Sequence, residues 1–169
     1  MNGYRILIVD DEINILSALR RLFSSEGYTL FTALSAEEGL EVLAREKIDL
    51  IISDQKMPGM NGLEFLEKTV ESYPDIIRII LTGHAELDDT IRAINTGCIY
   101  KFILKPWNNE DLKITVRRAI EQYNLVLENR DLTMELKKRD KMLDELEKQY
   151  PGITHRPRNG IFEIKSEDF

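Results

Sequence analysis

Short apolar segments alternate with amphipathic segments over the first 124 residues of the chain. Five apolar segments are rich in β-branched or aromatic residues and have the length of strands: Arg5–Val9, Tyr28–Ala33, Leu50–Ser53, Ile76–Leu81 and Ile99–Leu104. Three of them are almost continuously hydrophobic, as expected for parallel strands covered on both faces. The intervening segments carry apolar residues at the spacing of one helix face. The pattern predicts five β-α units that form an α/β domain with a doubly wound, five-stranded parallel sheet.

The last helical segment is longer than the others. No Gly or Pro interrupts it from about Asn109 to about Tyr150, so it would reach roughly 60 Å at ~1.5 Å per residue. Its second half repeats with spacings of four and three residues, at Leu125, Asn129, Leu132, Leu136, Arg139, Leu143, Leu146 and Tyr150. This repeat is typical of a coiled coil. We therefore expect one domain over residues 1–124 and a helical coiled-coil extension over residues 125–150.

The repeat predicts a homodimer through residues 125–150. Asn129 at a seam position favours a parallel pair in one register. In such a pair Glu135 of one helix would lie near Asp140 of the other, and these like charges repel. A single solvated helix is the alternative.

Residues 151–169 begin with the helix-breaking pair Pro151-Gly152. Ile153–Arg156 and Ile161–Ile164 flank a turn sequence at Asn159-Gly160, which is the arrangement of a small hairpin. Because an isolated hairpin is marginally stable in water, the start of a further domain is the other interpretation.

Composition narrows the class of protein. The chain has 23 basic and 30 acidic residues, a net charge of -7, so it lacks the positive field that dominates nucleic-acid binding. Cys98 is the single cysteine, which excludes an internal disulfide and favours a reducing, cytoplasmic compartment. No apolar run approaches the roughly 18 residues of a membrane span, and no signal-peptide pattern precedes the first strand. We expect no direct contact with nucleic acid or membrane.

Polar residues follow the predicted strands at the ends where parallel sheets bind ligands. Asp10 and Asp11 follow the first strand, Asp54 the third, Thr82 the fourth and Lys105 the fifth. Taken singly, each has a structural explanation as a helix cap, a turn residue or a surface lysine. Their joint occurrence at successive strand ends indicates a shared site instead.

Three carboxylates at one sheet edge require either a cation or raised pKa values. Mg²⁺ is the suitable cofactor because it binds one or two carboxylates together with phosphate oxygens and water. A carboxylate can also attack phosphorus and form an aspartyl phosphate. The metal ion, a hydroxyl and an ammonium group would then stabilise the charge on the transferred group. The set therefore predicts phosphorylation of Asp54 with Mg²⁺, assisted by Thr82 and Lys105.

The motifs ILIVDDE, IISDQKMPGMNGLEFL, IILTGHAE and YKFILKPW resemble the CheY-like receiver domain of two-component response regulators, over about residues 4–124. The resemblance implies the flavodoxin-like strand order 2-1-3-4-5. It also implies that Asp54 accepts a phosphoryl group from a sensor histidine kinase. Asp10 and Asp11 match the family's acidic pair, and the resemblance places Asp11, Asp54 and the backbone carbonyl of Lys56 on Mg²⁺.

The same resemblance implies a conformational switch. Thr82 would move toward the phosphoryl group while Phe102 turns inward, which alters the face made by the fourth helix, fifth strand and fifth helix. Lys56 and His84 would flank the pocket and influence dephosphorylation. The Lys105–Pro106 bond matches one that is characteristically cis. We expect the switch to control dimerisation or output rather than catalysis.

Two alternatives come from other functional classes. A haloacid-dehalogenase-like, Mg²⁺-dependent phosphatase also uses an aspartate, a threonine and a lysine, but it needs Asp-x-Asp after the first strand, where this chain has Asp10-Asp11-Glu12. The other alternative is a receiver-like adaptor that is not phosphorylated. The intact set of charged and hydroxyl residues disfavours it.

Overall fold

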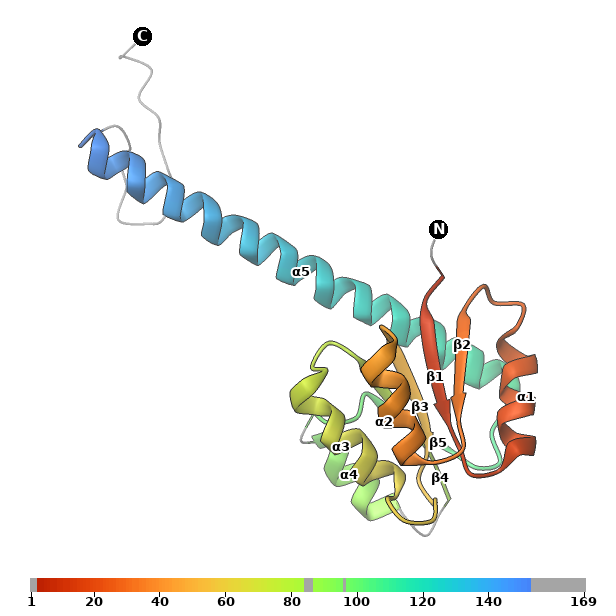
Figure 1. The fold of residues 1–169 in the computed structure, drawn as a ribbon. Coiled ribbons are helices and arrows are strands. Elements are labelled where there is room, and N and C mark those ends of the chain that lie inside the picture. Colours follow the sequence, from red (N-terminus) through yellow and green to blue (C-terminus); the bar gives the residue numbers. More distant parts are fainter. Residues whose placement is uncertain (1–2, 84–86, 96, 153–169) are drawn as a thin grey trace. The chain divides into compact units, whose positions relative to one another are not determined.

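The computed structural model describes residues 3–83, 87–95 and 97–152. The elements are β1 (Arg5–Val9), α1 (Ile13–Phe23), β2 (Thr29–Ala33), α2 (Ala36–Arg45), β3 (Leu50–Asp54), α3 (Gly62–Ser72), β4 (Ile77–Thr82), α4 (Leu87–Asn95), β5 (Lys101–Leu104) and α5 (Asn109–Gln149) (Figure 1). The predicted α/β class and the five β-α units are confirmed.

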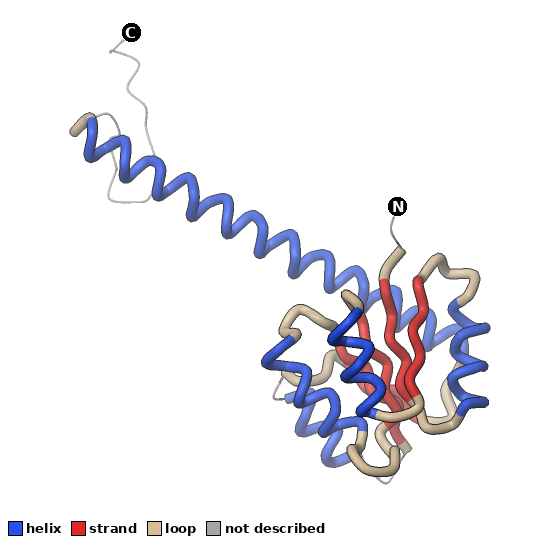
Figure 2. Tube along the Cα trace, in the orientation of Figure 1, coloured by secondary structure: helices blue, strands red, loops and turns tan. Residues whose placement is uncertain are grey.

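The sheet is parallel throughout and has the order β2-β1-β3-β4-β5. Figure 2 shows its strands in red between the helices that cover the two faces. Val9 pairs with Ala33 on one side and with Ser53 on the other, and Thr82 pairs with Leu104. The carboxyl ends of all five strands therefore meet at one edge, and the expected order 2-1-3-4-5 is confirmed.

The fifth strand begins later than predicted. Ile99 is buried in the core, but its backbone N–H donates to the carbonyl of Ala93 in α4 at 3.4 Å rather than to a neighbouring strand. Hydrogen bonding to β4 is established only at Tyr100, whose N–H donates to Arg78 O at 2.8 Å. The apolar character of Ile99 thus reflects burial beneath α4 and not membership of the strand.

Two apolar layers enclose the sheet. The first, under α2, α3 and α4, includes Leu7, Val9, Leu43, Ile51, Phe65, Ile80 and Ala93. The second, under α1 and the first part of α5, includes Ile6, Ile8, Leu19, Ile52, Ile79, Leu112 and Val116. Neighbouring strand residues alternate between the layers, and each buried Leu or Ile stabilises the fold by about 1.5–3 kcal/mol. The almost continuous hydrophobicity of the central strands follows from this double coverage.

The starts of α2 and α3 are capped by side chains. Ser35 accepts a hydrogen bond from the N–H of Glu38, but the Glu38 carboxylate accepts from Leu34 N–H rather than from Ser35. A reciprocal capping box forms instead at α3, between Asn61 and Glu64.

The chain divides into two compact units, Met1–Val126 and Leu127–Phe169. In the first unit α5 buries one face, which ends at Tyr123. In the second unit the described helical residues are exposed or half-buried, and Leu132, Leu136, Leu146 and Tyr150 of the predicted seam are exposed. The long C-terminal helix is confirmed.

The predicted hairpin lies outside the described residues, as does His84. None of the described helices combines the length and the hydropathy that crossing a bilayer requires.

Candidate functional site

The carboxyl edge of the sheet brings four of the predicted site residues into buried or half-buried positions. Asp10 and Thr82 are fully buried, Asp54 is 5% exposed, and Lys105 is half-buried, whereas Asp11 is exposed. Buried carboxylates are costly unless they are paired or hydrogen-bonded. Their partners therefore define the site.

The carboxylates of Asp10, Asp11 and Asp54 each have an oxygen within 4.8 Å of the other two. Lys105 lies among them, with Nζ 2.7 Å from Asp54 Oδ1 and 3.4 Å from Asp10 Oδ2. Asp10 Oδ1 also accepts the N–H of Glu12 at 2.8 Å. The cluster thus consists of three carboxylates, whose oxygens can serve as metal ligands, and one ammonium group of opposite charge.

Burial and mutual interaction shift the pKa values of this cluster. Burial raises the pKa of Asp10 above its usual value, and the negative charge of Asp54 raises it further. The hydrogen bond from Glu12 N–H and the positive charge of Lys105 lower this pKa but do not cancel the effect of burial. Burial would lower the pKa of Lys105, but the hydrogen bond and charge of Asp54, with a contribution from Asp10, outweigh it and raise that pKa. Lys105 therefore remains an ammonium group at neutral pH.

Asp11 does not serve as the cap of α1. Glu12 occupies the N-cap position, and no side chain accepts a hydrogen bond there. The structural explanation of Asp11 as a helix cap is therefore wrong, and its carboxylate is available to the acidic cluster.

The loop after Asp54 holds this residue against α3. Gln55 donates its N–H to Leu81 O at 2.8 Å, and its carbonyl accepts Gly62 N–H at 3.0 Å. A Cβ atom at Gly62 would collide with the Asp54 carbonyl oxygen. Sequence reasoning missed this role, although Asn61-Gly62 is a turn-forming pair that could have drawn attention to it.

The other described residues of the predicted set lie on or directly after β4 and β5, and in the loop after β3. Thr82 Oγ1 donates to Gly83 O at 3.2 Å, and Lys105 N–H donates to Thr82 O at 2.9 Å. The Lys105–Pro106 bond is cis, as the resemblance implied. Phe102 pairs with Ile80 and packs, half-buried, against the first apolar layer. Lys56 is exposed.

The donor set indicates which cation would fit. Carboxylate oxygens with no nitrogen or sulfur ligand among the three residues suit hard ions such as Mg²⁺ and not zinc or copper. Asp10, Asp11 and Asp54 are the side chains that would hold it.

Comparisons with known proteins agree with this arrangement. The family profile described as the response regulator receiver domain matches residues 6–117. The hydrogenase transcriptional regulatory protein HoxA of Cupriavidus necator is 39% identical over 132 residues, which are 78% of this chain and 27% of HoxA. Sporulation initiation phosphotransferase F of Bacillus subtilis is 33% identical over 120 residues, which cover 71% of this chain and 96% of that protein.

Solved structures with the same fold include two receiver domains. The signal receiver domain of an HD domain-containing protein from Pseudomonas fluorescens has a TM-score of 0.69 at 38% identity, and the match covers 72% of this chain and 98% of the other. A CheY-like response regulator receiver domain protein from Methanospirillum hungatei has a TM-score of 0.68 at 34% identity, covering 72% and 97%. Against HoxA, this chain spans only about a quarter of the relative's length.

Proposed function

The chain belongs to the response regulator receiver domain family, and we propose that it accepts a phosphoryl group on Asp54 from the phosphohistidine of a sensor histidine kinase. One observation carries this proposal. The buried carboxylate of Asp54 lies 2.7 Å from the Lys105 ammonium and beside two further carboxylates, at the ligand-binding edge of the sheet.

The chemistry follows from these groups. A carboxylate oxygen of Asp54 attacks phosphorus, a P–O bond forms, and the P–N bond to the donor imidazole breaks, with the electron pair leaving on nitrogen. Lys105 and the Thr82 hydroxyl stabilise the negative charge of the phosphoryl oxygens. Asp10, Asp11 and Asp54, with the Lys56 carbonyl, would hold Mg²⁺, which when bound would supply further neutralisation of that charge. The product is one acyl phosphate per chain, so the protein acts as a switch and not as an enzyme.

We propose Thr82 and Phe102 as the residues that transmit the change. They lie on the adjacent strands β4 and β5, and Phe102 is only half-buried. If the Thr82 hydroxyl turns toward phosphorylated Asp54, the space beside it changes and Phe102 can pack further inward. The surface of α4, β5 and α5 is then biased toward a second arrangement. Because α5 continues to Gln149, phosphorylation would control homodimerisation through residues 125–150 or the contact with an output partner.

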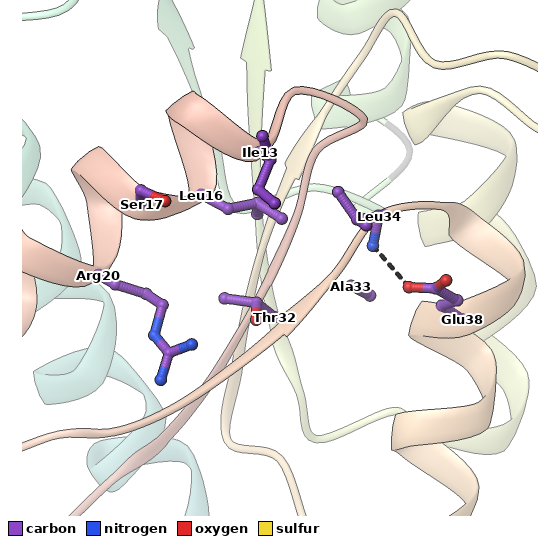
Figure 3. A pocket seen from close by; sticks show the side chains of 8 residues that line it. All are labelled: Ile13, Leu16, Ser17, Arg20, Thr32, Ala33, Leu34 and Glu38. Carbon is purple, nitrogen blue, oxygen red and sulfur yellow. Dashed lines mark hydrogen bonds between the residues drawn. The ribbon is translucent and has the colours of Figure 1, made fainter.

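A pocket beside the acidic cluster supports a protein as the phosphoryl donor. It lies between α1 and the end of β2, has a volume of about 270 Å³, and is lined in part by Ile13, Leu16 and Leu34 (Figure 3). Ile13 is 64% exposed and Leu34 42% exposed, although both are large and apolar. Ile13 follows Asp11 and Glu12 directly in the chain. We propose that an apolar side chain of the kinase packs here while its phosphohistidine reaches Asp54. Such a kinase domain, and this chain, would be cytoplasmic.

Incubation with acetyl phosphate and Mg²⁺ tests the acceptor. Intact-mass measurement is expected to show one added phosphoryl group that hydroxylamine removes, and none on Asp54→Asn. Asp131→Asn makes the same change on an exposed residue of α5 and should be labelled like the wild type. Equal labelling of Asp54→Asn would assign the acceptor elsewhere, and an unlabelled wild type would favour the adaptor function.

A further inference from the structure

The last part of α5 carries exposed leucines on the predicted seam. Leu125, Leu132 and Leu136 are each more than half exposed. Two polar residues, Asn129 and Arg139, interrupt this row and are exposed as well. Leucines that repeat every three and four residues on a helix surface bury themselves against a partner helix. The residues that face one another across the seam decide which orientation of the two helices fits.

A parallel pair of two copies places charges of the same sign together. In such a pair, identical seam positions face each other. Arg139 would therefore face Arg139 of the second copy inside the interface. On both flanks of the seam, Glu135 of one copy would lie near Asp140 of the other. These contacts repel, and burying two guanidinium groups against each other adds a desolvation cost.

An antiparallel pair matches the same seam differently, because each a position then faces a d position of the partner helix. Asn129 is an a position and Arg139 a d position, so one register places them opposite each other. The guanidinium has only donors, and the side-chain carbonyl of asparagine can accept from it. Shifting one helix by a heptad places Asn129 opposite Leu132 or Leu146 instead.

The same register pairs the leucines with one another. Within residues 125–143 the remaining layers are Leu125 with Leu143 and Leu132 with Leu136, and each layer occurs twice by symmetry. Glu135 faces its own copy once, at the centre of the paired segment. We propose that a second copy of this chain binds residues 125–143 in antiparallel orientation, with Asn129 opposite Arg139. This inference rests on the homodimerisation in the proposed function.

Asn129→Asp has opposite consequences in the two orientations. In the antiparallel register it places a carboxylate opposite each Arg139, so the dissociation constant in sedimentation equilibrium is expected to fall by at least about threefold. In a parallel pair two carboxylates would meet, and the constant would rise. Gln149→Glu adds the same charge on an exposed position beyond the paired segment and should leave the constant unchanged.

An Arg139→Met background shows whether the gain depends on the proposed pair. In this background Asn129→Asp should no longer tighten the dimer. A rise of the constant in the wild-type background, no change there, or an equal gain in both backgrounds would overturn the inference.

Disulfide formation reports the orientation independently. ¹⁵N-labelled Leu125→Cys is mixed with unlabelled Leu143→Cys in a glutathione redox buffer, and intact mass is expected to show covalent dimers of mixed mass. In the antiparallel register the two copies of position 125 lie about 27 Å apart along the helices, so neither variant should link to itself. Cys98 is buried, and the wild type should give no covalent dimer. Covalent dimers within each variant, and none between them, would overturn the inference.

Both measurements are made in Mg²⁺, with and without beryllofluoride, a mimic of the phosphoryl group. A parallel dimer overturns the antiparallel register but leaves the proposed homodimerisation in place. A wild type that is monomeric under both conditions overturns both. Phosphorylation of Asp54 is measured separately by intact mass, so the acceptor function stands or falls on its own result.

Discussion

The Lys105 ammonium is closer to Asp54 Oδ1, at 2.7 Å, than to Asp10 Oδ2, at 3.4 Å. Lys105 follows β5, whereas Asp54 ends β3, and β4 lies between these two strands in the sheet. The ion pair therefore spans the end of β4, where Thr82 is buried. Asp54 and Lys105 therefore lie on either side of Thr82, the proposed switch residue. A change of charge at Asp54 would act directly on this ion pair.

Lys105→Met is expected to destabilise the protein when no divalent cation is present. The substitution leaves Asp10 and Asp54 buried without their counter-charge, which should cost about 1–3 kcal/mol of unfolding free energy, the range for buried groups left without a partner. Urea unfolding at neutral pH measures the loss. Added Mg²⁺ should stabilise the variant more than the wild type because it replaces the missing cation. Lys68→Met, on the exposed surface of α3, should have little effect. A wild-type stability for Lys105→Met would show that the pair is not stabilising.

The sequence predicted which side chains lie together at the sheet edge better than it predicted what surrounds them. Asp10, Asp54, Thr82 and Lys105 end or directly follow strands, and in a parallel sheet that position alone brings them to one edge. Gln55 is different. Its buried Oε1 has no hydrogen-bond partner among the described residues, and its N–H donates to Leu81 O; the strand pattern shows neither feature.

Contacts between distant segments were equally hidden in the sequence. The steric limit at Gly62 arises because the loop folds back on the Asp54 carbonyl. Periodicity also failed at Ile99, since an apolar residue buried under α4 resembles one in a strand. The alternation of apolar and amphipathic segments was sufficient to predict the number of strands, because helices cover both faces of the sheet and make each strand apolar.

Arg78 is a buried charge that sequence reasoning missed. It is 5% exposed, and its guanidinium donates to Thr69 Oγ1 and to the carbonyls of Thr69, Tyr73 and Ile76, at 2.6–2.9 Å. Burial lowers the pKa of the group. Three of these acceptors belong to the last turn of α3 and the residue that follows it, so Arg78 ties that helix end to β4.

Arg78→Met is expected to reduce the unfolding free energy by about 2–4 kcal/mol, because it leaves several buried acceptors unpaired. Thermal and urea unfolding measure the effect. Arg45→Met is the matched control, since its ion pair with Glu41 is well exposed and should contribute less than about 0.5 kcal/mol. Similar losses for the two variants would contradict the role of Arg78.

Tyr123 makes the unfolding free energy of the domain depend on pH in the alkaline range. Burial, followed by the charge and hydrogen bond of Asp49, raises its pKa from the ordinary 10.0 to about 12. The folded state thus favours the neutral phenol. This contribution is fully present below pH 10 and is lost as the pH rises toward 12.

Tyr123→Phe should therefore lose less unfolding free energy than the wild type between pH 9 and pH 11, as urea unfolding at each pH would measure. Asp49→Asn removes the second cause but not burial, so its pH dependence should lie between the two. If the wild type and Tyr123→Phe have the same slope, Tyr123 does not control the alkaline stability.

Leu136→Glu is expected to weaken the homodimer that we propose for residues 125–150. Leu136 lies on the predicted seam and is 58% exposed in the single chain, whereas Met134 is 46% exposed and lies outside the seam. A glutamate on the seam enters the interface twice, so the dissociation constant should rise by at least about tenfold in sedimentation equilibrium. Met134→Glu introduces the same charge and should leave the constant unchanged. Equal weakening by both variants would indicate charge repulsion rather than a seam, and a monomeric wild type would support the solvated single helix.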